Sequence, residues 1–297
     1  MFPQVPFSPC TAGMMDNVPM PSSQQSLGII AGNGILPSLV ARSAKNLGYR
    51  VCCVGLKNQF DPALRTSCDE FSEVGMAKIG RWIRLMKKWD IDEAVMVGGV
   101  GKTVMHDPFR LLRMMPDVRG LSLWYRRLRH DRRDATVLAA IADELLRAGV
   151  TLIDSTTHIK EHLVTTGTVG SIEPSSQQTN DITFGWPLLR ETVELHIGQA
   201  IAVREGDVLA VEAIEGTAAL IKRAGELCKR KGWTLLKTAA SDHDMRADVP
   251  SIGTETIAQC ADAGCGCIAV GANNVILLDK PAVIDAANSA GISIVGI

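Results

Sequence analysis

The chain has few aromatic residues: they make up 4% of its 297 residues, whereas hydrophobic residues as a whole make up 46%. Its core must therefore be packed mainly with Ala, Val, Leu and Ile. No apolar run approaches the length that a bilayer-spanning helix needs, so the sequence contains no sign of a transmembrane segment. At this length we expect a globular protein of two ordinary domains.

The sequence also lacks a regular cysteine motif, although the chain has eight cysteines. They follow no repeated spacing, and Cys265-Gly266-Cys267 lacks the two-residue gap of a zinc knuckle. We interpret them as small core residues of a reduced protein, which predicts a cytoplasmic location.

Neither sign of charge dominates, since the formal net charge is −1. The whole chain therefore has no electrostatic reason to bind nucleic acid or an anionic membrane, and we expect no nucleic-acid partner. Locally, residues 126–133 form a dense basic run. Such a run is usually a solvated helix face, but it can also contact phosphates or acidic lipid headgroups.

The first 26 residues contain no Lys or Arg and are rich in Pro, Ser, Met and Gln. A signal peptide needs a basic start and a continuous apolar segment, and neither is present. We expect residues 1–26 to form a disordered extension.

Residues 27–155 alternate between strand and helix patterns. Strands are predicted at 27–31, 49–55, 70–74, 93–97 and 150–153, and helices at 36–47, 78–88 and 135–148. Alternating elements of this size predict a Rossmann-like α/β domain with a parallel sheet.

Residues 160–297 show a different pattern, which predicts a mixed α/β C-terminal domain. Residues 165–179 have a loop-like composition, and a hairpin is expected at 200–211. Further helices are predicted at 184–197, 217–231, 252–264 and 281–290, and further strands at 233–238, 267–271, 275–279 and 292–297.

Two glycine-rich turns follow predicted strands, with Gly32 and Gly34 in the first and Gly98 and Gly99 in the second. Ligand phosphates commonly bind at such turns. The first turn lacks the third glycine of the dinucleotide fingerprint, because Pro37 stands there, and residues 98–102 lack the spacing of a P-loop. Phosphate contact and a tight turn required by the fold both stay open for each.

The segment 244–254 carries two carboxylates four residues apart, Asp244 and Asp248, with Arg246 between them. Carboxylates are hard oxygen ligands for Mg²⁺, and the planar guanidinium can grip a phosphate. The alternative is that Asp248 or Thr254 caps the next helix while Arg246 pairs with either acid at the surface.

A second acidic cluster lies upstream, where Glu212 and Glu215 precede Gly216 and Thr217. These carboxylates could orient a water molecule or support a metal ligand. The alternative is that one of them caps the helix that begins at Thr217.

Several blocks occur in one order along the chain: Ile-Ala-Gly-Asn-Gly-Ile-Leu-Pro at 30–37, Gly-Gln-Ala at 198–200, Glu-Ala-Ile-Glu-Gly-Thr at 212–217, Lys237, and residues 244–253. Together they resemble the bacterial UDP-2,3-diacylglucosamine pyrophosphatases called LpxI, from about Leu27 to the C-terminus. The resemblance implies hydrolysis of a UDP-linked diacylated glucosamine to UMP and 2,3-diacylglucosamine 1-phosphate (lipid X), for lipid A biosynthesis.

Pyrophosphate hydrolysis calls for a divalent cation, so we expect Mg²⁺ bound by Asp244 and Asp248. The expected catalytic residues are Asp244, Asp248, Arg246 and Lys237. The expected substrate-binding residues are Gly32, Gly34, Gly98, Gly99, Asp181, Gln199, Glu212, Glu215, Gly216 and Thr217. Gln199 and Asp181 rest on the resemblance alone, and a surface position is the rival interpretation of Lys237.

The chain departs from the family pattern at a few positions. His243 stands where Gln is expected, Ala218 where Asp is expected, and Arg132-Arg133-Asp134 where Gly-Asp-Asp is expected. His243 could itself bind metal or shuttle a proton, although an exposed loop histidine is the more ordinary interpretation.

A diacylated substrate implies transient contact with the membrane surface, at the inner face of the inner membrane, and a homodimer stays open. Two other functions are compatible with parts of the sequence. A nucleotide-dependent oxidoreductase would use the first domain, but the incomplete glycine fingerprint counts against it. A non-catalytic protein that binds a lipid-sugar nucleotide would keep the same cleft without the chemistry.

Overall fold

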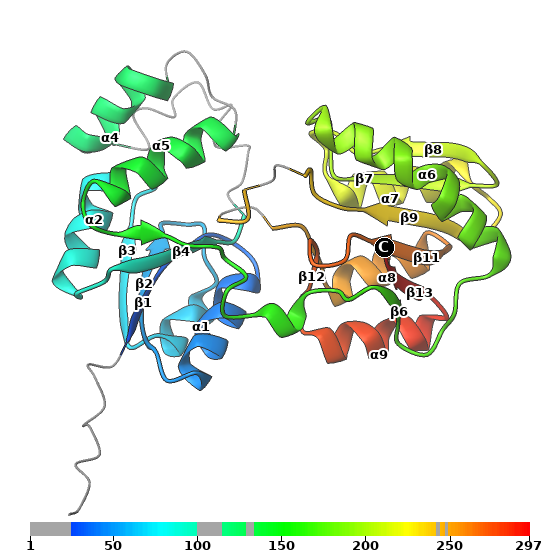
Figure 1. Cartoon of the computed structure of the whole chain (residues 1–297), viewed down its shortest axis with the longest axis horizontal. Helices are drawn as coiled ribbons and strands as arrows, with labels where there is room; N and C mark the ends of the chain where they lie inside the picture. Colours follow the sequence, from blue (N-terminus) through cyan, green and yellow to red (C-terminus); the bar gives the residue numbers. More distant parts are fainter. Residues whose placement is uncertain (1–24, 100–114, 129–133, 242–243, 247–248) are drawn as a thin grey trace, which may run out of the picture.

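The computed structural model describes residues 25–99, 115–128, 134–241, 244–246 and 249–297. These residues form two lobes, each built around its own β-sheet (Figure 1). The expected N-terminal extension lies outside the described residues except for its last two positions, and its final residue, Ser26, already begins the first strand. Among the described residues, no helix is both long and apolar enough to cross a membrane.

The first lobe contains a five-stranded sheet in the order β3-β2-β1-β4-β5, and every neighbouring pair in it is parallel. The strands are β1 (Ser26–Ala31), β2 (Arg50–Leu56), β3 (Glu70–Val74), β4 (Glu93–Val97) and β5 (Thr151–Leu152). The predicted parallel α/β sheet is therefore confirmed. The strand order reverses between β1 and β4, and the crevice at that point is where such sheets bind ligands.

Helices cover both faces of this sheet. Side chains of β2 alternate, so that Val51 and Cys53 pack with α1 (Leu36–Asn46), while Cys52 and Val54 pack with α2 (Ile79–Lys88) and α5 (Asp134–Leu146). Burial on both sides explains the nearly continuous apolar run of this strand. Three short elements were not predicted from the sequence: the 3₁₀ helix η1 (Pro62–Ser67), α4 (Val118–Leu123) and the π-helical turn η3 (Trp124–Leu128).

The second lobe contains a six-stranded sheet in the order β6-β13-β11-β9-β7-β8. The strands are β6 (Gly167–Val169), β7 (Ala200–Arg204), β8 (Asp207–Val211), β9 (Trp233–Lys237), β11 (Cys265–Val270) and β13 (Ser293–Gly296). The central strands β9, β11 and β13 are parallel, whereas β6, β7 and β8 pair antiparallel. The predicted mixed α/β architecture is confirmed. A short pair, β10 (Ser251–Ile252) with β12 (Ile276–Leu277), lies outside this sheet.

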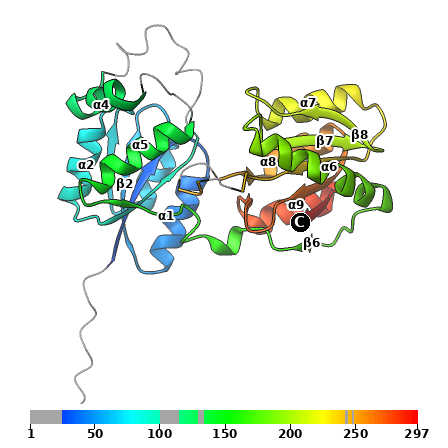
Figure 2. The same ribbon diagram turned by 45° about the horizontal axis from the view of Figure 1, so that its top comes forward.

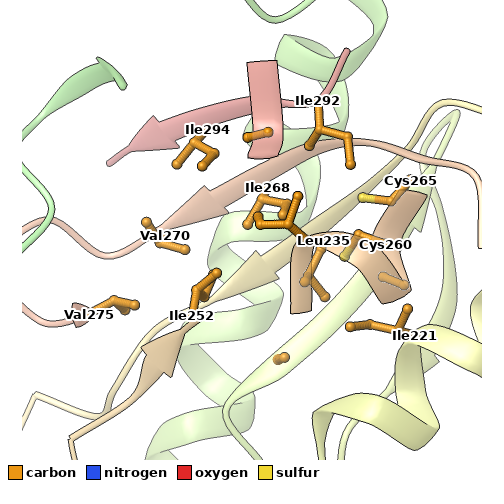
Figure 3. Packing of buried hydrophobic residues seen from close by; sticks show 14 of the residues in the cluster. Ile221, Leu235, Ile252, Cys260, Cys265, Ile268, Val270, Val275, Ile292 and Ile294 are labelled. Atoms are coloured by element: carbon orange, nitrogen blue, oxygen red, sulfur yellow. The ribbon is translucent and has the colours of Figure 1, made fainter. Parts of the chain in front are cut away.

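Four helices cover the second sheet. On one face, Leu235, Ile268 and Ile294 lie in line on adjacent strands and form part of the largest buried cluster (Figure 3). This cluster also contains residues of α7 (Thr217–Leu227), α8 (Thr254–Asp262) and α9 (Lys280–Ala290). The other face is covered by α6 (Ser176–Glu194). Figure 2 shows the same arrangement after a 45° turn about the horizontal axis.

Helix α6 begins earlier than the sequence pattern predicts. The expected start was residue 184 and the observed start is Ser176, because Ser175 and Gln178 form a capping box. The Ser175 hydroxyl accepts from the Gln178 N–H at 3.3 Å, and the Gln178 side chain accepts from the Ser175 N–H at 2.8 Å. The loop prediction for 165–179 is therefore wrong at 167–169, which form β6, and at 176–179.

Two passages of chain run between the lobes (Figures 1 and 2). The first, 153–164, leads from β5 to β6 through the turn η4 (Lys160–His162), and the second, 238–250, leads from β9 to β10. Both contact the first lobe, since Ile159 and Val249 belong to the buried cluster of α1. The Ser43 hydroxyl of α1 also donates to the His158 carbonyl at 2.6 Å. The described residues of both passages thus pack against the first lobe, and they position the candidate site.

Candidate functional site

The two glycine turns of the first lobe lie against each other at the point where the strand order reverses. The Gly32 N–H donates to the Val97 carbonyl at 2.8 Å. Asn33 and Gly99 exchange two backbone hydrogen bonds, of 2.8 and 2.9 Å. Turns separated by about 65 residues in the sequence therefore form one backbone surface at the carboxyl ends of β1 and β4.

Close packing explains two of these glycines. A Cβ on Gly32 would lie 2.7 Å from the Gly98 carbonyl oxygen, and a Cβ on Gly98 would lie 2.7 Å from the Gly32 carbonyl carbon. Gly98 also has a φ of +92°. Gly34 and Gly99 have open space where a Cβ would stand. The fold thus requires glycine at 32 and 98 by packing and at 34 by its φ of +101°, and the exposed backbone at 34 and 99 is accessible to a ligand.

Asp244 and Arg246 form an ion pair in the middle of the second passage. The Arg246 Nε lies 2.8 Å from Asp244 Oδ1, and its Nη2 lies 2.6 Å from Oδ2. These hydrogen bonds raise the pKa of the Arg246 guanidinium above its usual value. Both side chains are partly exposed, at 30% and 39%. His243 and Asp248 lie outside the described residues.

Ser155 joins this loop to the first sheet. The residue is fully buried, and its hydroxyl lies 3.0 Å from the Met96 carbonyl oxygen and 2.9 Å from the Arg246 carbonyl oxygen. Its N–H donates to the Met245 carbonyl at 3.0 Å. Met96 lies near the end of β4, two residues before Gly98, so Ser155 brings Arg246 close to the glycine turns. Sequence reasoning missed Ser155, because a serine in a connection carries no signal of its distant partners.

A second polar group lies at the carboxyl end of β9 in the other lobe. The Lys237 ammonium donates to Thr217 Oγ1 at 3.1 Å and to the Ser251 carbonyl at 3.2 Å. The Thr217 hydroxyl in turn donates to Glu212 at 2.9 Å. Lys237 is 7% exposed and Glu212 is 8% exposed, so the rival interpretation of Lys237 as a surface residue is wrong. One hydroxyl bridges a buried cation and a buried carboxylate.

Gln199 also belongs to this group, because its N–H donates to Glu212 Oε2 at 3.3 Å. Glu215 points elsewhere and pairs with Arg223 at 3.3 Å. Gly216 precedes α7 with a φ of +85° and makes no side-chain cap. Helix α7 therefore begins without the glutamate cap considered from the sequence.

Asp181 lies apart from these residues. It is fully buried in α6, and its Oδ1 accepts from the Gly206 N–H at 3.1 Å in the turn between β7 and β8. Lys237 pairs with Ala200, at the other end of β7. The structure thus places Asp181 and Lys237 near opposite ends of β7.

The described residues do not by themselves complete a metal site. Among them, no group of three or more His, Cys, Asp or Glu side chains lies close enough to hold an ion. Asp244 has the right donor chemistry, but in this structure its oxygens accept hydrogen bonds from Arg246. Mg²⁺ commonly takes only one or two protein carboxylates and keeps its waters or substrate oxygens. The fit to Mg²⁺ is therefore partial.

Two cavities lie outside this arrangement. One, of about 620 Å³, runs along α7 and α8 between Ala218 and Asp262. The other, of about 430 Å³, has an apolar lining that includes Ile182, Trp186 and Ile297. Neither is lined by Lys237, Asp244 or Arg246, so neither identifies the reacting centre.

Comparison with known families shows two matches that together cover most of the chain. Residues 26–162 match the LpxI N-terminal domain, and residues 165–295 match the LpxI C-terminal domain. A relative from Caulobacter vibrioides, described as UDP-2,3-diacylglucosamine pyrophosphatase LpxI, is 30% identical over 283 residues. That alignment covers 92% of this chain and 98% of the relative.

Similarity to solved structures is weak. A pyruvate carboxylase variant from Rhizobium etli aligns with a TM-score of 0.28 and 14% identity, over 61% of this chain and 15% of that chain. A phosphoribosylglycinamide synthetase from Anaerococcus prevotii aligns with a TM-score of 0.23 and 14% identity, over 69% of this chain and 43% of that chain. Scores this low say nothing about the site or activity of the chain.

Proposed function

Because the chain belongs to the LpxI family, we propose that it hydrolyses the pyrophosphate of UDP-2,3-diacylglucosamine. The products are UMP and 2,3-diacylglucosamine 1-phosphate (lipid X), and the reaction is a step of lipid A biosynthesis. The family and the name of the relative support a diphosphatase that acts on this substrate. The geometry of the site supports a reaction centre contributed by both lobes.

The observation that carries the proposal is the position of the passage 238–250. Ser155 of the first passage holds Arg246, in the middle of this second passage, next to the turns of the first sheet. Lys237 of the second sheet holds Ser251, which lies just beyond the C-terminal end of the passage. A substrate with a nucleotide on one side of its pyrophosphate and a diacylated sugar on the other needs contacts from two directions. We place the pyrophosphate along this passage and the acyl chains between the lobes, where ligand sites commonly form.

The described side chains suggest distinct roles. Arg246 holds a planar fork of N–H donors toward a carboxylate, and a phosphate oxygen pair fits the same fork. The described hydrogen bonds of Lys237 go to Thr217 and Ser251, so we assign it a positioning role in place of the catalytic role expected from the sequence. The accessible backbone at Gly34 and Gly99 is available to the nucleotide phosphates.

The divalent cation remains part of the proposal, with Asp244 and Asp248 as its protein ligands. When bound, such a cation would neutralise charge on the phosphoryl oxygens. Asp244 must exchange its hydrogen bonds from Arg246 for that role, and the exchange would free the guanidinium for the substrate. This residue pair therefore connects cation binding to phosphate binding.

We further propose that the protein works in the cytoplasm and contacts the inner membrane at its surface, because its substrate carries two acyl chains. Free thiols at the seven described cysteines are compatible with a reducing compartment. We also propose that the protein forms a homodimer, and light scattering on the purified chain tests this by measuring its molar mass.

The proposal is tested by incubating the purified chain with UDP-2,3-diacylglucosamine and measuring UMP and lipid X. We expect stoichiometric release of both, its loss in EDTA, and its recovery with excess Mg²⁺. Binding of the substrate without release of UMP would instead indicate a non-catalytic protein that binds the lipid-sugar nucleotide. An NAD(H) fluorescence change with no response to UDP would favour the oxidoreductase. Release that persists unchanged in EDTA would remove the cation from the proposal but leave the hydrolase.

A further inference from the structure

Helix α2 presents a basic face to solvent. Its buried side, Ile79, Trp82, Ile83 and Met86, packs on the first sheet. The opposite side consists of four exposed cations and a glycine, in a helix with no acidic residue: Arg81, Arg84, Lys87 and Lys88, with Gly80. Cations three and four residues apart lie on one helix face and repel one another.

No carboxylate among the residues that the structure describes forms an ion pair with these four cations. Within the described part of the chain, the Arg84 side chain hydrogen-bonds only to the Gly80 carbonyl at 3.3 Å. Nearby arginines behave differently: Arg119 pairs with Glu144, and Arg127 pairs with Asp143. A helix face of this composition creates a positive potential that suits anions spread over an area better than a single anion.

An exposed apolar stripe adjoins the basic face. Met115, Val118, Leu121 and Tyr125 recur about every third residue along α4 and its flanks, and they are 67%, 86%, 55% and 66% exposed. Helix α4 contacts the start of α2, where the Arg81 N–H donates to Asp117 Oδ2 at 3.0 Å. Large apolar side chains exposed together mark an interaction site.

We propose that α2 and α4 form the surface with which this protein docks onto an anionic lipid bilayer. Cations attract anionic headgroups, and neighbouring apolar side chains insert at the boundary between headgroups and acyl chains. A nucleic acid would use the cations but would have no use for Val118 and Leu121. The bilayer as partner rests on the proposed function, which requires a substrate with two acyl chains.

The position of this surface suits that role. Helices α2 and α4 lie on the side of the first lobe that faces away from the second lobe (Figures 1 and 2). Docking there leaves the passages between the lobes unobstructed. The surface differs from the basic run expected at 126–133, since Arg127 pairs with Asp143 and residues 129–133 lie outside the described residues.

The test compares two triple variants of the full chain, without substrate, in sedimentation with vesicles. The vesicles contain phosphatidylethanolamine and phosphatidylglycerol, or phosphatidylcholine alone as the neutral comparison. R84Q/K87Q/K88Q removes three cations of α2, and K222Q/K229Q/K231Q removes three exposed cations of the second lobe as the matched control. V118S/L121S tests the apolar stripe independently.

Each cation near an anionic surface contributes about a fivefold gain in binding, so we expect R84Q/K87Q/K88Q to bind anionic vesicles on the order of 100-fold more weakly. V118S/L121S should also bind more weakly, and the second-lobe control should match wild type. UMP release from substrate in non-ionic micelles should be unchanged in all three variants, whereas release from substrate embedded in anionic vesicles should fall in the first two.

The proposal is overturned if wild type does not sediment with anionic vesicles, or if the α2 variant and the second-lobe control lose the same amount of binding. Vesicle binding is measured without substrate, and it can therefore succeed where hydrolysis fails. Failure of the docking surface is in this way distinguished from failure of the proposed activity. Thermal melting of each variant shows that a loss of binding does not come from unfolding.

Discussion

Asp244 has a structural and a catalytic interpretation whose consequences differ. In the structure it pairs with Arg246, and both side chains are partly exposed. An ion pair of that exposure contributes about 1 kcal/mol or less to stability. A carboxylate that places a cation against the pyrophosphate acts mainly on the transition state, through charge placement and not through packing.

We therefore expect Asp244→Ala and Asp248→Ala each to reduce turnover at least about 100-fold while stability falls by no more than about 1 kcal/mol. Substrate should still bind, because the uridine and the acyl chains make contacts remote from the cation. The measurements are UMP formation, substrate retention and thermal melting. Glu73→Ala, which breaks a comparable surface pair with Arg65, is the control. Turnover at the wild-type rate in both aspartate variants would show that the metal-site assignment is wrong.

At the scale of elements, one hydroxyl holds three segments together. Thr217 begins α7, accepts from Lys237 at the end of β9, and donates to Glu212 just after β8. Lys237 also reaches Ser251 at the start of β10. If the hydroxyl is lost, a buried ammonium and a buried carboxylate each lose a hydrogen-bond partner.

We expect Thr217→Val, which keeps the shape of the side chain, to destabilise the protein by about 1–3 kcal/mol. Thr217→Ser keeps the hydroxyl and should remain close to wild type. The free energy of unfolding in urea provides the comparison, and UMP formation should follow the same order if Lys237 is a positioning residue. Equal stability of the two variants would contradict the bridging role of the hydroxyl.

Element boundaries show where local sequence information is sufficient. The strand at 93–97 and the helix at 36–47 follow from apolar periodicity and flanking glycine, and the structure agrees to within a residue. Helix α6 was predicted too short, because its first turns, from Ser176 to Asn180, are polar and lack that periodicity. The capping box at Ser175 and Gln178 was the available signal.

At the scale of the whole molecule, His158 lies where the first passage meets the first lobe. It is 4% exposed, and its ring lies edge-on to Tyr49 at 4.8 Å between centroids. Among the residues that the structure describes, its Nδ1 has no hydrogen-bond partner. Burial lowers the pKa of His158 below its usual 6.5, and the charge of Glu93 offsets part of that effect.

A histidine with a lowered pKa in the folded state contributes stability that is present above its unfolded pKa of 6.5 and is lost as the pH falls below it. We expect His158→Phe, which keeps a ring against Tyr49 but cannot titrate, to reduce the slope of melting temperature against pH between about pH 7 and pH 5. The exposed His196, replaced by Asn, is the control and should keep the wild-type slope. An unchanged slope in His158→Phe would show that other groups cause the acid sensitivity.

The sequence by itself determined the class of each sheet and the residue types of the candidate site. Apolar periodicity, glycine turns and the Asp-x-Arg spacing at 244–246 are local properties, and local properties can be read from neighbouring residues. The Asp244 ion pair was among the alternatives that this spacing left open. The sequence also left open a tight turn at Gly32 and at Gly98, but it did not show that these two turns contact each other, because that contact depends on how two strands pair.

Only the tertiary structure decided which candidates lie together. Ser155 contacts Met96 and Arg246 across 59 and 91 residues of sequence, and no spacing rule encodes such separations. Lys237 is buried because Thr217 and Ser251 meet over the end of β9. Asp181 lies near the opposite end of β7, because α6 packs across the face of the same sheet and places Asp181 beside the turn between β7 and β8. Position in a sheet depends on strand order, and strand order is set by packing over the whole chain.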